Sequence, residues 1–196
     1  MRFDTGCPCC RDDFYDYEEW LMSRVSVIEH PLAQHTLTLS RRGGGEPDYK
    51  RRLMRALGAM LCCEATRDLE LRAVETGSAS GALAPALAEG EPALAFLAGA
   101  DPEFIEGARS VCPSAPAEAA NRLAILLDAS PDHGHAAAAA IQQLKVSGAK
   151  RVRYACALAA PEDIEAVRLA HPEVDVFVIA MDAEPGEQSG GVCAGA

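Results

Sequence analysis

Three stretches in the second half of the chain are apolar at nearly every position. They read "RLAILLDA" (122–129), "RVRYACALAA" (151–160) and "VDVFVIAMD" (174–182). Such runs, rich in Leu, Ile and Val, are typical of strands that are covered on both faces of a sheet. Two stretches of helical character, 134–149 and 161–171, lie between them. This order predicts a βαβαβ unit with a parallel sheet, and a ligand is then expected beyond the carboxyl ends of the strands, where residues 128–135 lie.

The first half of the chain predicts a short strand and two helices. Residues 25–42 read as a strand, a proline-marked turn and a helix, and residues 43–49 read as a loop. A long helix is expected over 49–71, with an apolar face made by Leu53, Leu57, Met60 and Leu61. Six cations cluster in this region: Arg41, Arg42, Lys50, Arg51, Arg52 and Arg55. They form either a solvated helix face or the mouth of an anion site.

Residues 1–24 differ in character from the rest and are expected to form an extension to one main domain, 25–196. Carboxylates and aromatic side chains alternate from Asp12 onward, and Phe14, Tyr17 and Leu21 fall at helical spacing. A short amphipathic helix is therefore expected over 12–24. Its apolar face would pack on its own domain or across a dimer interface, or it would dock on another protein.

Composition narrows the range of partners and locations. The chain has 196 residues, 49% of them hydrophobic, and a net charge of −11. This charge argues against nucleic acid or an anionic membrane as the main partner, because both are bound through neutralising Lys and Arg. No apolar run approaches the roughly 18 residues of a membrane span, and no signal-peptide pattern is present, so a cytoplasmic location is expected.

The eight cysteines are expected to be thiols, metal ligands or core residues rather than a disulfide framework. Cys7, Cys9 and Cys10 could supply three ligands of a tetrahedral zinc site, or they could be surface or packing thiols. Cys62 and Cys63 would point about 100° apart on a helix. Cys63 is expected to be buried as a small apolar group.

Two motifs of the first half, "VIEHPLAQHTLTLSR" and "RALGAMLCCEATRDLEL", resemble the "HPL...H.L" and "EAT.DL" elements of uracil phosphoribosyltransferases. The second half is similar to that family's strand, phosphoribosyl-pyrophosphate loop, helix, "AAPEGI" turn and "HP.V" strand. The resemblance implies a type I phosphoribosyltransferase fold, a Rossmann-like parallel α/β sheet flanked by helices. In this chain the N-terminal helical extension, residues 1–24, precedes that fold. It also implies a homodimer and a small-molecule ligand. By their match to the family's elements, His30, His35, Glu64, Thr66 and Asp68 are expected to be structural, the last three tying the helix end to its neighbours.

The loop "DASPDHGHA" (128–136) departs from the family's "DPMLATGGS". Asp128 and Gly134 match it, whereas Asp132, His133 and His135 replace small residues whose amides would hold a phosphate. A carboxylate there would repel a phosphate dianion. The "LAGADP" stretch (97–102) likewise lacks the arginine of the family's pyrophosphate-binding "RAGLGM" element. The family's long flexible hairpin has no counterpart in "SAPAEAAN" (114–121), which precedes the strand at Arg122.

These departures predict a remodelled site. His133 or His135 is expected to act as a general base or as a ligand of a divalent metal, since the two would alternate along an extended turn. Asp128 and Asp132 would orient the imidazole, and Ser130, Gly134 and Ala136 would contact substrate. Alternatively, these are exposed loop residues, with Asp132 as a helix N-cap. Three functions stay open: a diverged enzyme acting on a small organic molecule, a non-catalytic binding or scaffold protein, and a genuine uracil phosphoribosyltransferase.

Overall fold

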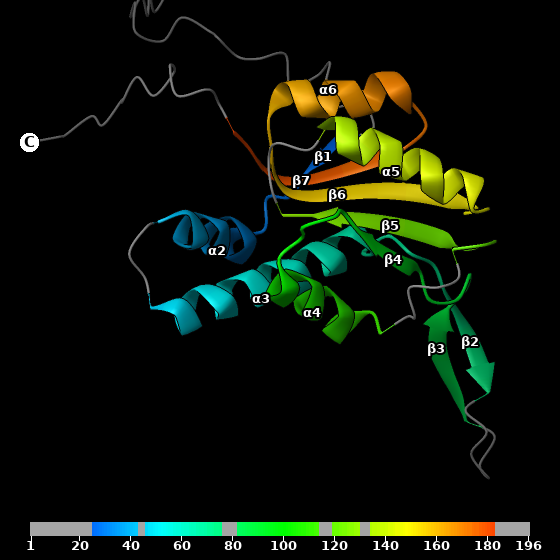
Figure 1. The fold of residues 1–196 in the computed structure, drawn as a ribbon. Coiled ribbons are helices and arrows are strands. Elements are labelled where there is room, and N and C mark those ends of the chain that lie inside the picture. The colour runs from blue at the N-terminus through cyan, green and yellow to red at the C-terminus, as the bar shows by residue number, and fades with distance from the viewer. Residues whose placement is uncertain (1–24, 43–45, 76–81, 114–118, 130–133, 183–196) are drawn as a thin grey trace, which may run out of the picture.

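A five-stranded, wholly parallel sheet forms the centre of the structure (Figure 1). The computed structural model describes residues 25–42, 46–75, 82–113, 119–129 and 134–182. The strand order is β1-β7-β6-β5-β4. The strands are β1 (Val25–Val27), β4 (Ala93–Phe96), β5 (Leu123–Asp128), β6 (Arg151–Ala159) and β7 (Asp175–Met181). The three apolar runs of the sequence are thus adjacent strands in the middle of the sheet, as predicted.

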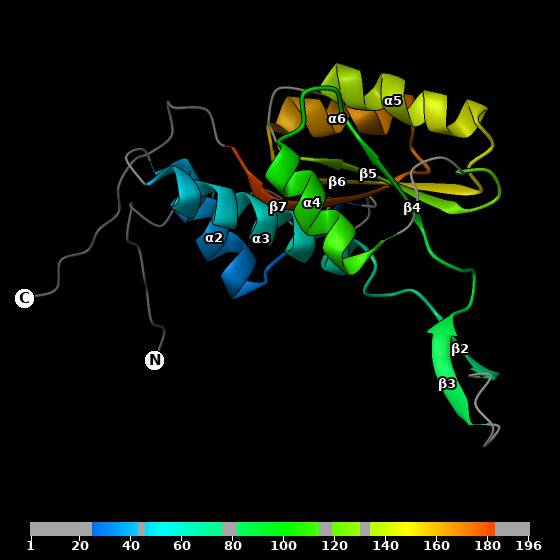
Figure 2. The same cartoon turned by 60° about the horizontal axis from the view of Figure 1, so that its bottom comes forward.

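Helices cover both faces of this sheet (Figures 1 and 2). One layer contains α2 (Pro31–Arg41), α3 (Pro47–Ala65) and α4 (Pro102–Val111), and the other contains α5 (Gly134–Val146) and α6 (Pro161–Ala170). Every residue of β5 is buried. Its side chains alternate between the layers: Ile125 and Leu127 join the apolar cluster of α3 and α4, while Ala124 and Leu126 join that of α5 and α6.

Two glycines allow α3 and α4 to pack with their backbones in close contact. A Cβ at Gly58 would lie 2.0 Å from the Phe104 carbonyl oxygen, and one at Gly107 would lie 1.9 Å from the Arg55 carbonyl oxygen. Since no side chain fits in either gap, the two glycines fix how α4 lies along α3. The start of α4, which lies at the carboxyl-end edge of the sheet, is positioned by this contact.

A hairpin stands apart from the main sheet. Strands β2 (Leu71–Glu75) and β3 (Leu83–Leu87) pair antiparallel with each other and project from the body of the molecule (Figure 2). The expected helix over 49–71 is therefore wrong at its end, because α3 stops at Ala65 and Leu71 already pairs with Leu87. The Thr66 hydroxyl donates to the carbonyl oxygens of Cys62 and Cys63, which caps the last turn of the helix.

The predictions for residues 1–24 stay untested, because these residues lie outside the part that the structure describes. They concern the helix over 12–24 and the metal site at Cys7, Cys9 and Cys10. Among the described residues, no helix has both the length and the apolar character needed to span a bilayer.

Candidate functional site

The carboxyl ends of the parallel strands form the edge at which the sequence predicts a ligand. Asp128 ends β5, is only 2% exposed and lies beside Cys156 of β6 in the strand register. Burial raises the pKa of the Cys156 thiol and of the Tyr154 phenol, and the Asp128 charge adds to both shifts. Both groups therefore stay protonated at neutral pH, and neither is available as a nucleophile.

The first turn of α5 faces solvent at this edge. Helix α5 begins at Gly134, and both His135 and Ala136 are exposed. The prediction that His133 and His135 alternate along an extended turn is wrong for His135, because this residue already belongs to the helix. Ser130, Asp132 and His133 lie outside the described residues, so the meeting of the two imidazoles stays a prediction.

A metal site at this edge also stays a prediction. Within the described ranges, no group of three or more His, Cys, Asp or Glu side chains is arranged to hold a metal ion. His133 falls outside those ranges. His135 is thus the one predicted ligand that the structure describes, and it lies at a solvent-exposed helix start.

The start of α4 lies at the end of β4 and carries its own anion. The Asp101 carboxylate accepts hydrogen bonds from the backbone N–H groups of Glu103, at 2.8 Å, and Phe104, at 3.2 Å. These are two of the donors that a helix N-terminus offers to a bound anion. Leu97, which stands where the resemblance would place an arginine, is buried in the core. The N–H groups of Glu103 and Phe104 at the start of α4 are therefore already hydrogen-bonded within the chain.

An ion pair lies beside the carboxyl-end edge of the sheet, at the end of β7. The Asp182 N–H donates to the Ala159 carbonyl oxygen at 2.8 Å, and the Asp182 carboxylate pairs with Arg41 of α2, also at 2.8 Å. Arg41 is one of the six clustered cations of the sequence. This cation therefore ties α2 to the end of β7, and its charge is already balanced.

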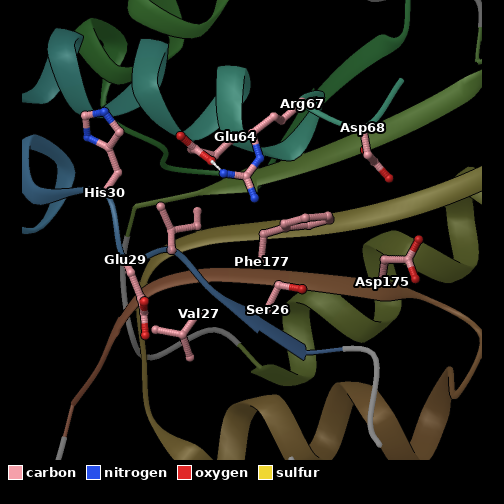
Figure 3. Close-up of a pocket in the computed structure, with 10 residues that line it drawn as sticks. Ser26, Val27, Glu29, His30, Glu64, Arg67, Asp68, Asp175 and Phe177 are labelled. Atoms are coloured by element: carbon pink, nitrogen blue, oxygen red, sulfur yellow. Dashed lines mark ion pairs between the residues drawn. The ribbon is translucent and has the colours of Figure 1, made fainter. Parts of the chain in front are cut away.

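A hollow, which the sequence did not predict, lies between the end of α3 and strands β7 and β1 (Figure 3). Its volume is about 600 Å³. His30, from the "HPL" motif, and Glu64 and Asp68, from the "EAT.DL" motif, line it together. Each motif was recognisable alone, but only the pairing of β1 with β7 brings them to one place.

Arg153 of β6 secures the wall of this hollow. Its guanidinium is 3% exposed; it donates to the Ala65 carbonyl oxygen at 2.6 Å and to both carboxylate oxygens of Asp68, at 2.6 and 2.7 Å. It also lies over the Phe177 ring, 5.4 Å from the ring centre. The Arg153 hydrogen bonds hold the pKa of Asp68 below its usual range. The structural role expected for Asp68 agrees with these contacts, whereas the hydrogen bonds of the Thr66 hydroxyl stay within the last turn of α3.

The neighbouring imidazoles and thiols differ from what was expected. His30 and His35 are both exposed, and His30 caps α2 without a side-chain hydrogen bond. The expected burial of Cys63 is wrong: Cys63 is exposed, whereas Cys62 is buried. Successive helical residues point about 100° apart, so only one of the two can face the core. A hydrogen bond with Cys112, together with burial, raises the pKa of the Cys62 thiol and keeps it protonated.

The parallel sheet and the two helical layers define a type I phosphoribosyltransferase-like α/β protein. Comparison with solved structures agrees on the fold. The AQ2163 protein from Aquifex aeolicus superposes with a TM-score of 0.72 over 81% of this chain and 87% of that chain, at 23% sequence identity.

Sequence comparison gives the family. Residues 95–190 match the family model described as uracil phosphoribosyltransferase. The uracil phosphoribosyltransferase of Rhizobium etli is 35% identical over 191 residues, which cover 85% of this chain and 91% of the relative. That of Brucella anthropi is 34% identical over 188 residues, which cover 84% of this chain and 90% of the relative. The chain belongs to the uracil phosphoribosyltransferase family, a family of transferases.

Proposed function

We propose that this chain is a diverged member of its family that acts on a small organic molecule at the carboxyl-end edge of the sheet and no longer performs ordinary phosphoribosyl transfer. The observation that carries the proposal is the Asp101 cap on α4. Its position corresponds to the family's pyrophosphate-binding element, as the resemblance aligns "LAGADP" with "RAGLGM". A carboxylate already bonded to the helix N–H groups would repel a pyrophosphate placed there.

The loop between β5 and α5 supports the same conclusion. Asp132, His133 and His135 stand in place of small residues that would leave backbone amides free for the 5′-phosphate. In this proposal, His133 or His135 meets the ligand as a general base, or as a ligand of a divalent metal. Asp128, which is buried at the end of β5, is proposed to act with Asp132 as an orienting group. Ser130, Gly134 and Ala136 offer backbone contacts.

We further propose that residues 25–196 act as one domain and assemble as a homodimer, with residues 1–24 as an extension. The hairpin supports a dimer, because an isolated pair of strands is marginally stable and Leu71 and Leu83 on it are strongly exposed. Light scattering is expected to give about twice the chain mass of 20.7 kDa. A monomer at micromolar concentration would contradict this assembly.

The decisive test is an assay with uracil, phosphoribosyl pyrophosphate and magnesium. The Rhizobium etli relative serves as the positive control under identical conditions. The expected result is no uridine monophosphate above background for this chain. Turnover in the common enzyme range, about 1 per second or faster, would overturn the proposal and favour a genuine uracil phosphoribosyltransferase.

A further inference from the structure

Two buried thiols from different helices meet where α3 and α4 end. Cys62 lies in the last turns of α3 and is 1% exposed, and Cys112 directly follows α4 and is 8% exposed. Both are free thiols of one apolar cluster, and a hydrogen bond joins them. The Cys112 thiol donates its proton to the Pro92 carbonyl oxygen, at 3.6 Å. The Cys62 thiol is therefore the donor in the bond between the two sulfur atoms.

The packing of the two helices explains why these thiols meet. Helices α3 and α4 run in the same direction along their contact (Figures 1 and 2). Gly58 of α3 lies against Ala108 of α4, where a Cβ on the glycine would be 3.1 Å from the Ala108 nitrogen. Cys62 comes one helical turn after Gly58, and Cys112 comes one turn after Ala108. The two cysteines are thus the next contact along the same pair of helix faces.

This arrangement is close to what a disulfide requires. A disulfide needs Cα atoms about 4.4–6.8 Å apart and Cβ atoms that point toward each other. The helix backbones touch at Gly58 and Gly107, so side chains one turn further on face each other across a short gap. The two sulfur atoms are already within hydrogen-bonding distance. Joining them therefore asks for an adjustment of two side chains, while the helices stay where they are.

We propose that Cys62 and Cys112 form a redox-sensitive pair, which a peroxide oxidises to a disulfide that locks the end of α3 to the end of α4. The reduced protein keeps both thiols, as in the structure. Because α4 starts at Asp101, the disulfide would also restrain a helix that reaches the carboxyl-end edge of the sheet. The proposal does not depend on the reaction proposed above.

The oxidation has two steps. Cys112 is the more exposed thiol and lies at a helix end, so its sulfur attacks hydrogen peroxide first. The O–O bond breaks, Cys112 becomes a sulfenic acid, and one water leaves. The Cys62 sulfur then attacks the sulfenic sulfur, the S–O bond breaks, and the departing hydroxide takes the Cys62 proton to leave as a second water. Two thiols thus lose two electrons and two protons, and one peroxide is reduced to two waters.

Burial makes this reaction slow. The hydrogen bond with Cys112 and burial raise the pKa of the Cys62 thiol, and a protonated thiol is a poor nucleophile. Oxidation therefore waits for a transient opening of the last turn of α4. The pair differs in this respect from a rapid peroxide sensor, which needs an exposed thiol of low pKa. Once formed, the buried disulfide is equally shielded from reduction.

The test is peptide mapping of the full-length protein without reduction, after incubation for hours in about 1 mM hydrogen peroxide. Trypsin places Cys62 and Cys63 on one peptide, 56–67, and Cys112 on another, 110–122. The exposed Cys63 is therefore replaced in a Cys63→Ser variant, so that a link between the two peptides can involve only Cys62. We expect this linked pair, about 2 Da lighter than the sum of its two peptides for the two hydrogens lost, and its release by dithiothreitol.

The melting temperature provides a second measurement. The disulfide would close a loop of about 50 residues, and oxidation should therefore raise the melting temperature of Cys63→Ser by about 10 °C. Cys62→Ala should lose both the link and this rise. Cys156→Ala is the matched control, because it removes a buried thiol from the apolar cluster of α5 and α6, and it should keep both. Unchanged far-ultraviolet circular dichroism would show that each variant remains folded.

Two results would overturn the proposal. One is the lack of any link between peptides 56–67 and 110–122 in folded, peroxide-treated Cys63→Ser, a result that requires no substitution in the core. The other is a link that forms only in urea, or that leaves the melting temperature unchanged. In that case the sulfur atoms would meet outside the native packing, or their bond would not hold the helices together.

Discussion

The packing of α3 against α4 and β6 differs sharply from the carboxyl-end edge of the sheet. The first region is held by close backbone contacts at Gly58 and Gly107 and by the buried Arg153, bonded to Asp68. The second carries exposed or self-capping polar groups, among them His135 and Asp101. The first region is closely packed and buried, whereas the second exposes polar side chains to solvent.

This difference separates the residues that hold the fold together from those exposed at the carboxyl-end edge of the sheet. Asp68, which belongs to the "EAT.DL" motif, binds the buried Arg153, while Gly58 and Gly107 set the close approach of α3 and α4. Exposed residues of the edge, such as His135, contribute little to packing, so substitutions there cost little stability. Variants of the first region should therefore change stability strongly, and variants of the second should change function.

The largest expected effect follows from Gly58→Ala. The added Cβ would lie 2.0 Å from the Phe104 carbonyl oxygen, so α4 must move away from α3. We expect the free energy of unfolding to fall by about 3 kcal/mol or more, as measured by urea denaturation. Arg52→Ala, on an exposed position of the same helix, is the control and should change stability by less than about 0.5 kcal/mol. A small effect of Gly58→Ala would show that the helices can separate without strain.

A smaller loss is expected for Asp68→Ala, which removes both carboxylate hydrogen bonds of the buried Arg153 guanidinium and leaves it only the longer ion pair with Asp175, at 3.7 Å. Removing one partner of a fully buried pair costs about 3–5 kcal/mol, and the exposure of Asp68 to water reduces this to about 2 kcal/mol. Asp48→Ala, which breaks an exposed pair with Arg51, is the control and should cost about 0.5 kcal/mol or less.

The same pair predicts a dependence on pH. The pKa of Asp68 is lowered in the folded state, so its contribution is complete above the unfolded value of about 4. It is lost as the pH falls below that value through the lower folded pKa. The difference in stability between the parent and Asp68→Ala should therefore shrink in acid, and a constant difference from pH 7 to pH 2 would contradict the ion pair.

Asp101→Ala should lower the free energy of unfolding by about 1 kcal/mol, the usual cost of losing an N-cap. It also frees the N–H groups of Glu103 and Phe104. Pyrophosphate should therefore raise the melting temperature of this variant more than that of the parent. Asp101→Asn keeps a capping side chain without the charge, so its stability should stay close to that of the parent. An equal response of the parent and Asp101→Ala to pyrophosphate would argue against self-capping as the barrier.

The smallest change in stability is expected at His135. Its exposed side chain contributes within about 0.5 kcal/mol, so His135→Ala should melt like the parent. The same variant, and His133→Ala, should abolish the protein's output in a complemented deletion strain. His35→Ala replaces an exposed histidine on α2 and serves as the control. Full complementation by both His133→Ala and His135→Ala would reject the site assignment.

Local pattern was enough to predict much of this molecule. The buried strands β5, β6 and β7 were predictable because a strand covered on both faces must be apolar throughout, and that requirement is visible within each run. The position of Asp128 at the carboxyl end of its strand followed from the apolar run that precedes it. The motifs at His30 and Asp68 carried the family resemblance.

Contacts between distant segments were decided only in three dimensions. The bonded atoms of Asp68 and Arg153 are 85 residues apart in the chain, so no local period couples them. The same holds for Gly58 against Phe104, for the hollow between α3 and β1, and for the burial of Cys62 instead of Cys63. The sequence pattern shows which face of each element must be covered, because the spacing of apolar residues is a property of that element alone. Which element covers them depends on how all the elements pack together, and only the folded chain determines that.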